Sequence, residues 1–246
     1  MLHHETYTSK TFYMRIITLL VLTISTATFS QSSTDTLWGS KRFRAGLTMQ
    51  VGPAYWKQSN TNDLLIQNNR PVTKDYSMAV AVGNIFQWNR YRMTFLLLLA
   101  GNKNSANSES LENQLGGGEL NLEYSVIRKQ RFSISPIIGG GVVDGIIKIR
   151  QQASPQPISS VFVNRNTTEL FNRQGFINAG LNFGFAYAPK LKAHLFQLAT
   201  GYRFGFSNSD WSTDPNSAVL TNSATDPLRQ FYVTAKMNFL YADRRR

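Results

Sequence analysis

INAGLNFGFAY, residues 177–187, alternates between two kinds of side chain. One parity carries only small or polar residues, such as Asn178, Gly180 and Asn182. The other parity is apolar or aromatic and comprises Ile177, Ala179, Leu181, Phe183, Phe185 and Tyr187. A period of two is the side-chain period of a β-strand, because successive side chains point to opposite faces of a sheet. The stretch therefore predicts a strand with one apolar face.

Seven further segments repeat this alternation between Arg42 and Tyr241. Short turns are predicted around Asn89, Lys129 and Pro189, whereas the other joins are long and polar, at residues 57–75, 101–118, 151–174 and 207–229. Short turns at one end and long loops at the other are typical of a membrane barrel. We therefore predict an all-β fold, an antiparallel up-and-down eight-stranded transmembrane β-barrel with short periplasmic turns and long extracellular loops.

One segment departs from simple alternation. Its apolar residues keep one parity up to Ile138 and the other parity from Val143 onward, with three glycines, residues 139–141, between them. A change of parity at glycines predicts a β-bulge. Pro136 in the same segment is unexpected in a sheet without edges, because proline cannot donate a ladder hydrogen bond.

The alternation by itself allows a soluble lipocalin-type barrel, which has the same period with apolar residues inside. Two features favour the apolar faces pointing outward into lipid. These faces carry no charge over most of their length, and aromatic residues gather near the predicted strand ends, where membrane barrels carry interfacial girdles. Leu96 and Leu98 are exceptions, because they are apolar on a face that this choice makes luminal.

The opposite parity mixes glycine with charged residues, which suit a paired network in a lumen better than a dry core. The predicted lumen charge network comprises Arg44, Arg92, Glu119, Glu123, Arg203 and Lys236. The change of parity at the glycines adds Asp144 and Lys148 to this luminal set. A fixed salt-bridge plug is the first expectation for these residues, because eight strands leave an interior that side chains fill.

Residues 180–185, residues 201–206 and the amphipathic last segment, residues 231–241, resemble the small outer-membrane barrel family that includes PorT-like and OmpA-like barrel domains. The resemblance covers about residues 42–241 and implies this fold and an outer-membrane location. A PorT-like identity would imply a place in a secretion or envelope complex. One departure from the family is the basic tail that follows Tyr241, since such barrels often end at the final aromatic residue.

The first 30 residues predict a cleaved secretory signal peptide, which starts at Met1 or at Met14. Arg15 precedes an apolar run, residues 16–24, that is too short to span a bilayer, and a small-x-small pattern ends at Ser30. No later stretch is long and apolar enough for a transmembrane helix. The predicted organisation is a signal peptide at 1–30, a periplasmic linker at 31–41, the barrel at 42–241 and a basic tail at 242–246.

The composition argues against most enzyme classes. The chain has no cysteine, and His194 is the only histidine that follows the predicted signal peptide. His194 lies just after the turn at Pro189, and the loop residues Asp210 and Asp214 have no histidine partner in that loop. We therefore predict no catalytic residue, no metal site and no cofactor. A membrane-embedded lipid-modifying enzyme and a narrow channel stay open as alternative functions.

Without the predicted signal peptide the chain has 24 Lys and Arg residues against 13 Asp and Glu residues, a net charge of +11, and +9 of this charge lies at one end of the predicted barrel. The predicted periplasmic basic rim comprises Arg128, Lys129, Arg131, Lys190, Lys192, Arg244, Arg245 and Arg246, together with Lys41, Arg42 and Arg90. This rim could contact anionic lipid headgroups or dock an acidic periplasmic protein. Nucleic acid is excluded as a partner by the predicted compartment.

The sequence thus predicts a non-enzymatic barrel of the bacterial outer membrane that acts as an envelope anchor or scaffold. Its expected partners are outer-membrane lipids and an acidic periplasmic protein.

Overall fold

The computed structural model describes residues 43–106, 109–129, 132–151, 167–188, 193–206, 211–213 and 226–240. The predicted signal peptide, linker and basic tail lie outside these residues. The elements are β1 (Phe43–Trp56), α2 (Ser59–Gln67), β2 (Tyr76–Trp88), β3 (Tyr91–Ala106), β4 (Glu109–Tyr124), β5 (Ile127–Arg128), β6 (Ser133–Gln151), β7 (Thr167–Ala188), β8 (Ala193–Gly205) and β9 (Arg229–Leu240). In these parts of the chain, no helix has the length and hydropathy to cross a membrane.

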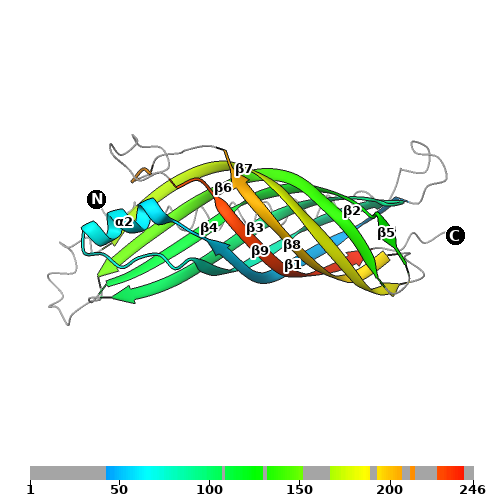
Figure 1. Cartoon of the computed structure of the whole chain (residues 1–246), viewed down its shortest axis with the longest axis horizontal. Helices are drawn as coiled ribbons and strands as arrows, with labels where there is room; N and C mark the ends of the chain where they lie inside the picture. Colours follow the sequence, from blue (N-terminus) through cyan, green and yellow to red (C-terminus); the bar gives the residue numbers. More distant parts are fainter. Residues whose placement is uncertain are drawn as a thin grey trace, which may run out of the picture.

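The strands form a closed antiparallel barrel (Figure 1). Closure comes from the pairing of β1 with β9 and of β4 with β6. Because β5 continues β4 along the edge of β6, nine strand segments make an eight-stranded barrel. The predicted all-β, antiparallel eight-stranded barrel is confirmed. We name the end with β5 and the tight turn at residues 89–90 the short-turn end, and the end with α2 the long-loop end. Asn89 in that turn has a φ of 56°, which hairpin turns of two residues favour and Asn tolerates.

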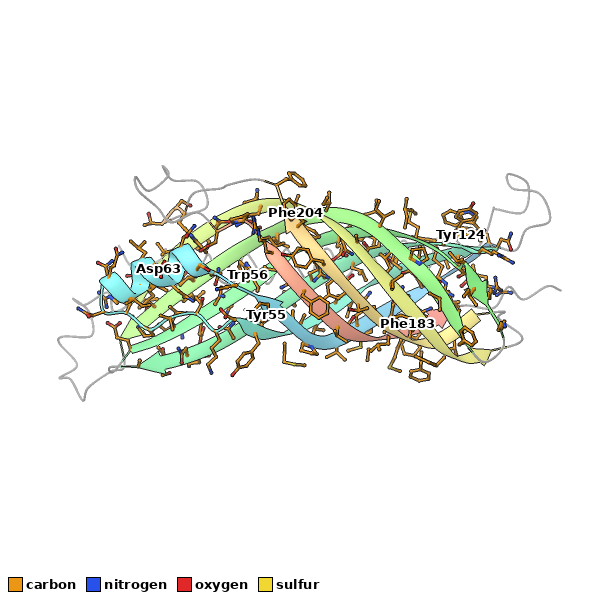
Figure 2. All side chains as sticks on the ribbon, viewed as in Figure 1. Tyr55, Trp56, Asp63, Tyr124, Phe183 and Phe204 are labelled. Atoms are coloured by element: carbon orange, nitrogen blue, oxygen red, sulfur yellow. The ribbon has the colours of Figure 1, made fainter. Side chains whose placement is uncertain are left out.

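Side chains alternate between the outside and the inside of the barrel. At the end of β1, Tyr55 is 47% exposed and points outward, whereas its neighbour Trp56 is 6% exposed and points inward (Figure 2). The outer surface carries large apolar side chains, among them Met49, Leu99, Leu122, Ile138, Val142, Ile177, Leu181, Leu198 and Phe239. Most of the inner surface is polar, which is the reverse of a soluble barrel.

Aromatic side chains border this apolar outer surface at both ends. At the short-turn end, the ring of Tyr91 lies 6.1 Å from Trp88 and 4.9 Å from Tyr124 between centroids. Towards the long-loop end, Tyr55 pairs across the sheet with Tyr76 and with Phe231. The apolar surface between the two aromatic borders forms a belt around the barrel, which we call the apolar belt.

The predicted bulge at residues 139–141 is wrong, because β6 pairs with both β4 and β7 through these glycines without a break in register. The irregularity lies nearer the short-turn end. Glu123 faces Ile137 but Ile127 faces Ile134, so the β4–β5 side has one extra residue. This irregular stretch lies opposite Pro136, where a residue without a backbone N–H interrupts the ladder least.

The predicted long loop at residues 101–118 is also wrong, and the predicted loop at residues 151–174 is too long, because β7 begins at Thr167. β3 and β4 pair as a hairpin up to Ala106 opposite Glu109, and β6 and β7 pair up to Arg150 opposite Thr167. The pairings with β2 and β8 end earlier, at Gly101 and Phe176. Four strands therefore rise beyond the rest of the barrel and form a protruding sheet of residues 102–106, 109–113, 142–151 and 167–175.

α2 lies against the inner side of this protruding sheet. Its Leu65 packs in a buried cluster with Leu111, Ile147 and Trp211. The preceding residue Gln58 makes no side-chain cap, and the carboxylate of Asp226 instead accepts the backbone N–H groups of Asn60 and Thr61 at 3.1 and 2.7 Å. A carboxylate at a helix N-terminus stabilises the unpaired N–H groups there. The long-loop end is thus capped by a helix that is held from a distant part of the chain.

Candidate functional site

Glu119 is the centre of a hydrogen-bond network that crosses the lumen. One carboxylate oxygen accepts from Nε and Nη2 of Arg203 at 2.9 and 2.8 Å. The other oxygen accepts from the side-chain amides of Asn121 and Asn178, each at 2.6 Å. All four residues are buried on inward-facing positions of β4, β7 and β8. Four donors, two of them charged, satisfy a carboxylate that would otherwise be costly to bury.

Arg203 extends this network to β9. Its Nη1 donates to Oε1 of Gln230 at 2.6 Å, and its guanidinium carbon lies 4.2 Å from the ring centroid of Tyr232. The Tyr232 hydroxyl donates in turn to Oδ1 of Asn178 at 3.1 Å. The two charges of this network were predicted from the sequence, but its amides and its tyrosine were not. Their inward parity was the available signal, because uncharged polar residues on that face are the natural partners of the charges.

A second charge cluster lies nearer the short-turn end. Lys236 forms an ion pair with Oε1 of Glu123, and Nη1 of Arg92 lies 3.6 Å from the other carboxylate oxygen. Nε of Arg92 donates to Oε1 of Gln87 at 3.2 Å. Two buried cations therefore share one buried carboxylate. Arg44, the last of the six predicted lumen residues, is buried on β1, where its backbone pairs with Gln87.

Asp144 and Lys148 do not lie in the lumen. Because β6 has no bulge, both residues keep the outward parity. They belong to a row of alternating charges on the outer face of the protruding sheet. Lys148 pairs with Glu169 at 2.9 Å, and Asp144 accepts from Nε of Arg173 at 2.6 Å. Lys103 and Arg150 both lie near Glu112, at 3.5 and 4.0 Å. The hydrogen bonds and charge of Asp144 raise the pKa of Arg173 above its ordinary value.

An apolar seal fills the lumen between the Glu119 network and α2. It consists of buried side chains from six strands and from the segment before β9: Trp56, Ala81, Leu96, Leu98, Leu115, Val143, Phe176 and Leu228. The apolar residues Leu96 and Leu98, which look misplaced in the sequence, belong to this seal. A hollow of about 10 Å³ beside Trp56, lined also by Ser77, Ala100 and Leu115, has room for about one water molecule.

The structure describes only part of the predicted basic rim. Arg128 lies at the short-turn end and donates to the backbone carbonyl of Asn89 at 2.8 Å. Lys129 lies 5.9 Å from the ring centroid of Phe132. Arg90 lies in the tight turn, where its backbone carbonyl accepts from the Ser125 N–H at 2.8 Å. The other predicted rim residues, Lys41, Arg42, Arg131, Lys190, Lys192, Arg244, Arg245 and Arg246, lie outside the described residues.

Few groups in the described residues offer catalytic chemistry. No group of three or more His, Cys, Asp or Glu side chains there is arranged to hold a metal ion. His194 lies on β8 near the short-turn end, where its backbone pairs with Tyr187. The loop residues Asp210 and Asp214 lie outside the described ranges. The site that the structure describes in detail is therefore the filled lumen and its cap.

Comparison with known proteins shows similarity in structure but not in sequence. No protein-family model and no curated protein matches this chain. Similar solved structures include Ail, the attachment invasion locus protein of Yersinia pestis, in complex with the heparin analogue sucrose octasulfate, at 10% identity and a TM-score of 0.46 over 80% of this chain and 99% of that chain. Neisserial surface protein A has 12% identity and a TM-score of 0.45, over 80% of this chain and 97% of its own. A major outer membrane protein from Thermus thermophilus has 10% identity and a TM-score of 0.47, over 79% of this chain and 99% of its own.

Proposed function

We propose that this chain is a non-enzymatic barrel of the bacterial outer membrane that anchors or scaffolds an envelope assembly, with its long-loop end outside the cell. The apolar belt supports insertion into a bilayer. Along β3 it runs from Tyr91 to Leu99 and along β7 from Ile177 to Phe185, spans that match the roughly 9–11 tilted residues needed to cross a membrane. In water this surface would be a large exposed apolar area.

The orientation follows from the two ends of the barrel. Short periplasmic turns and longer extracellular parts are the rule in outer-membrane barrels. The protruding sheet carries charged pairs such as Lys148–Glu169 on its outer face, which suits water rather than lipid. The short-turn end carries Arg128 and Lys129, whose charges suit the anionic headgroups of the periplasmic leaflet.

The filled lumen is the observation that carries an anchoring role. The Glu119–Arg203 network and the apolar seal occupy successive levels of the interior, so the described conformation has no continuous path for a solute. What remains available to partners is the protruding sheet with α2 at one end and the basic rim at the other. We propose an acidic periplasmic protein as the partner of that rim, and a place in a secretion or envelope complex, as the PorT-like resemblance implies.

The test combines topology, conductance and co-purification. An epitope inserted between Ala106 and Glu109 should be accessible on intact cells, whereas an epitope after Arg246 should become accessible only after the outer membrane is opened. Purified protein in planar bilayers should give no single-channel steps, and gentle solubilisation should co-purify periplasmic proteins. Inverted epitope accessibility would contradict the orientation. Regular single-channel steps would indicate a narrow channel instead of a scaffold. Turnover of bilayer lipids would indicate a lipid-modifying enzyme.

A further inference from the structure

We propose that the polar layer of the lumen around Glu123 is a binding site for a small inorganic anion, such as chloride. The layer lies between the Glu119 network and the short-turn end. It contains Arg92, Glu123 and Lys236 together with the uncharged side chains of Thr94, Ser133, Asn182 and Gln197, all of them buried.

The charges of this layer call for an anion. Lys236 and Arg92 share the single carboxylate of Glu123, and Nη1 of Arg92 lies 3.6 Å from it, beyond a good hydrogen bond. Among the inward-facing residues that the structure describes at this level, no second carboxylate balances the extra positive charge. An unbalanced charge inside a barrel surrounded by lipid is costly, and a bound anion relieves that cost.

The uncharged side chains supply the donors. Gln197 is 4% exposed and its side-chain amide has no hydrogen-bond partner. Asn182 is 1% exposed and interacts with the Glu123 carboxylate, whose Oε2 has no partner of normal geometry. The hydroxyls of Thr94 and Ser133 are likewise buried without a partner. Gln197 is paired in the sheet with Lys236, and Thr94 shares the inner face of β3 with Arg92, so these two donors lie next to the charges. Buried amides with no partner are rare, because each unmade hydrogen bond leaves a desolvated polar group uncompensated.

The neighbouring layer shows the contrast. There the carboxylate of Glu119 accepts four hydrogen bonds and balances the charge of Arg203, although Nε2 of Gln230 has no partner. Beyond it, the apolar seal has one side-chain donor, the unpartnered indole N–H of Trp56, and carries no charge. Only the layer around Glu123 combines surplus positive charge with unused donors among the described parts of the lumen.

The experiment measures the thermal unfolding of the refolded full-length chain in lipid vesicles, by the change in gel mobility of the folded barrel. Sodium chloride is titrated against sodium gluconate at constant ionic strength. The midpoint should rise with chloride and saturate, and it should not rise with gluconate, which is too large for the layer. In a parallel NMR measurement, the protein should broaden the chloride resonance. Added bromide should reduce this broadening, because it competes for the same site.

Gln197→Leu and Asn182→Leu are made separately, so that failure of one variant to fold leaves the other informative. Each should lose the chloride-dependent rise. Gln197→Leu should also keep at least the parent midpoint in gluconate, because it removes an unsatisfied buried amide. Lys148→Gln on the protruding sheet is the matched control and should keep the rise. A parent midpoint that ignores chloride would overturn the proposal, as would a full rise in both leucine variants.

Discussion

Arg203 on β8 and Glu119 on β4 lie 84 residues apart in the sequence and meet across the lumen, with Nη2 of the arginine 2.8 Å from the carboxylate. Their strands are not neighbours in the barrel, so the contact links opposite sides of it. Because both groups are almost fully buried, each is stable only in the presence of the other.

Removal of one partner should therefore be far more harmful than removal of both. Arg203→Met leaves the carboxylate of Glu119 buried without its cation, and we expect a loss of about 3–5 kcal/mol in the free energy of unfolding. The double variant Arg203→Met with Glu119→Gln should recover most of this loss, because no charge stays unpaired. Urea unfolding of the refolded protein measures both. Equal stability of the parent and the single variant would contradict the buried pair.

The two faces of β7 should respond differently to charge. Leu181 and Phe183 lie on the outer face, and Leu181→Arg or Phe183→Arg should reduce folding by roughly 2–4 kcal/mol if these positions lie near the middle of the bilayer. Asn182→Asp, which faces the lumen, should be milder. The yield of heat-modifiable barrel in the membrane fraction measures the effect. Similar tolerance at all three positions would mean that the apolar belt does not face lipid.

The cap on α2 should depend on Asp226. Asp226→Ala removes the acceptor of the Asn60 and Thr61 N–H groups, and we expect a local loss of about 1 kcal/mol. Amide hydrogen exchange at these two residues should become faster, whereas exchange in the belt-forming part of β7 should not change. Cleavage of the native barrel by an added protease should increase within α2. If the exchange rates stay at the parent level, another group holds this helix.

Variants of the basic rim should show whether it contacts lipid or docks an acidic protein, because binding of a protein depends on side-chain shape as well as on charge. Replacement of Arg128, Lys129 and Arg131 by glutamine removes three charges, whereas replacement of the two arginines by lysine keeps charge but loses the planar fork that pairs with carboxylates. An acidic protein partner should be lost from both variants and from the parent at high salt. Lipid contact alone should leave the lysine variant like the parent. Co-purification that survives in both variants, and after deletion of residues 244–246, would end the docking proposal.

The period of two was sufficient to predict the strands, their order and their faces, because each barrel strand separates an apolar outer face from a mostly polar lumen along its own length. It failed where the sheet leaves the belt. Val143 and Ile147 are apolar because they fill the interior beneath α2, not because they face lipid, so the apolar parity changes sides without any bulge. In the same region residues 102–106 are polar or small on both faces. A strand whose two faces do not differ in polarity has the same sequence pattern as a loop.

The partners inside the lumen were harder to predict for a different reason. The contacts between inward residues of β4 and β8 depend on the register of every pair of neighbouring strands between them. A local sequence pattern does not specify these registers. Glu119 and Arg203 could be assigned to the same interior, but their contact, and the choice of Asn178 rather than Asn182 as a ligand of Glu119, follow only from the closed barrel.

The protruding sheet has a mechanical consequence. β6 and β7 pair without interruption from Ser133 opposite Gly184 at the short-turn end to Arg150 opposite Thr167 at the tip. A load applied to the tip and directed along the strands would act on the hydrogen bonds of this ladder in shear, all at once, rather than opening them one after another. The same two strands cross the apolar belt, so a load on the tip would pass along one continuous ladder into the belt.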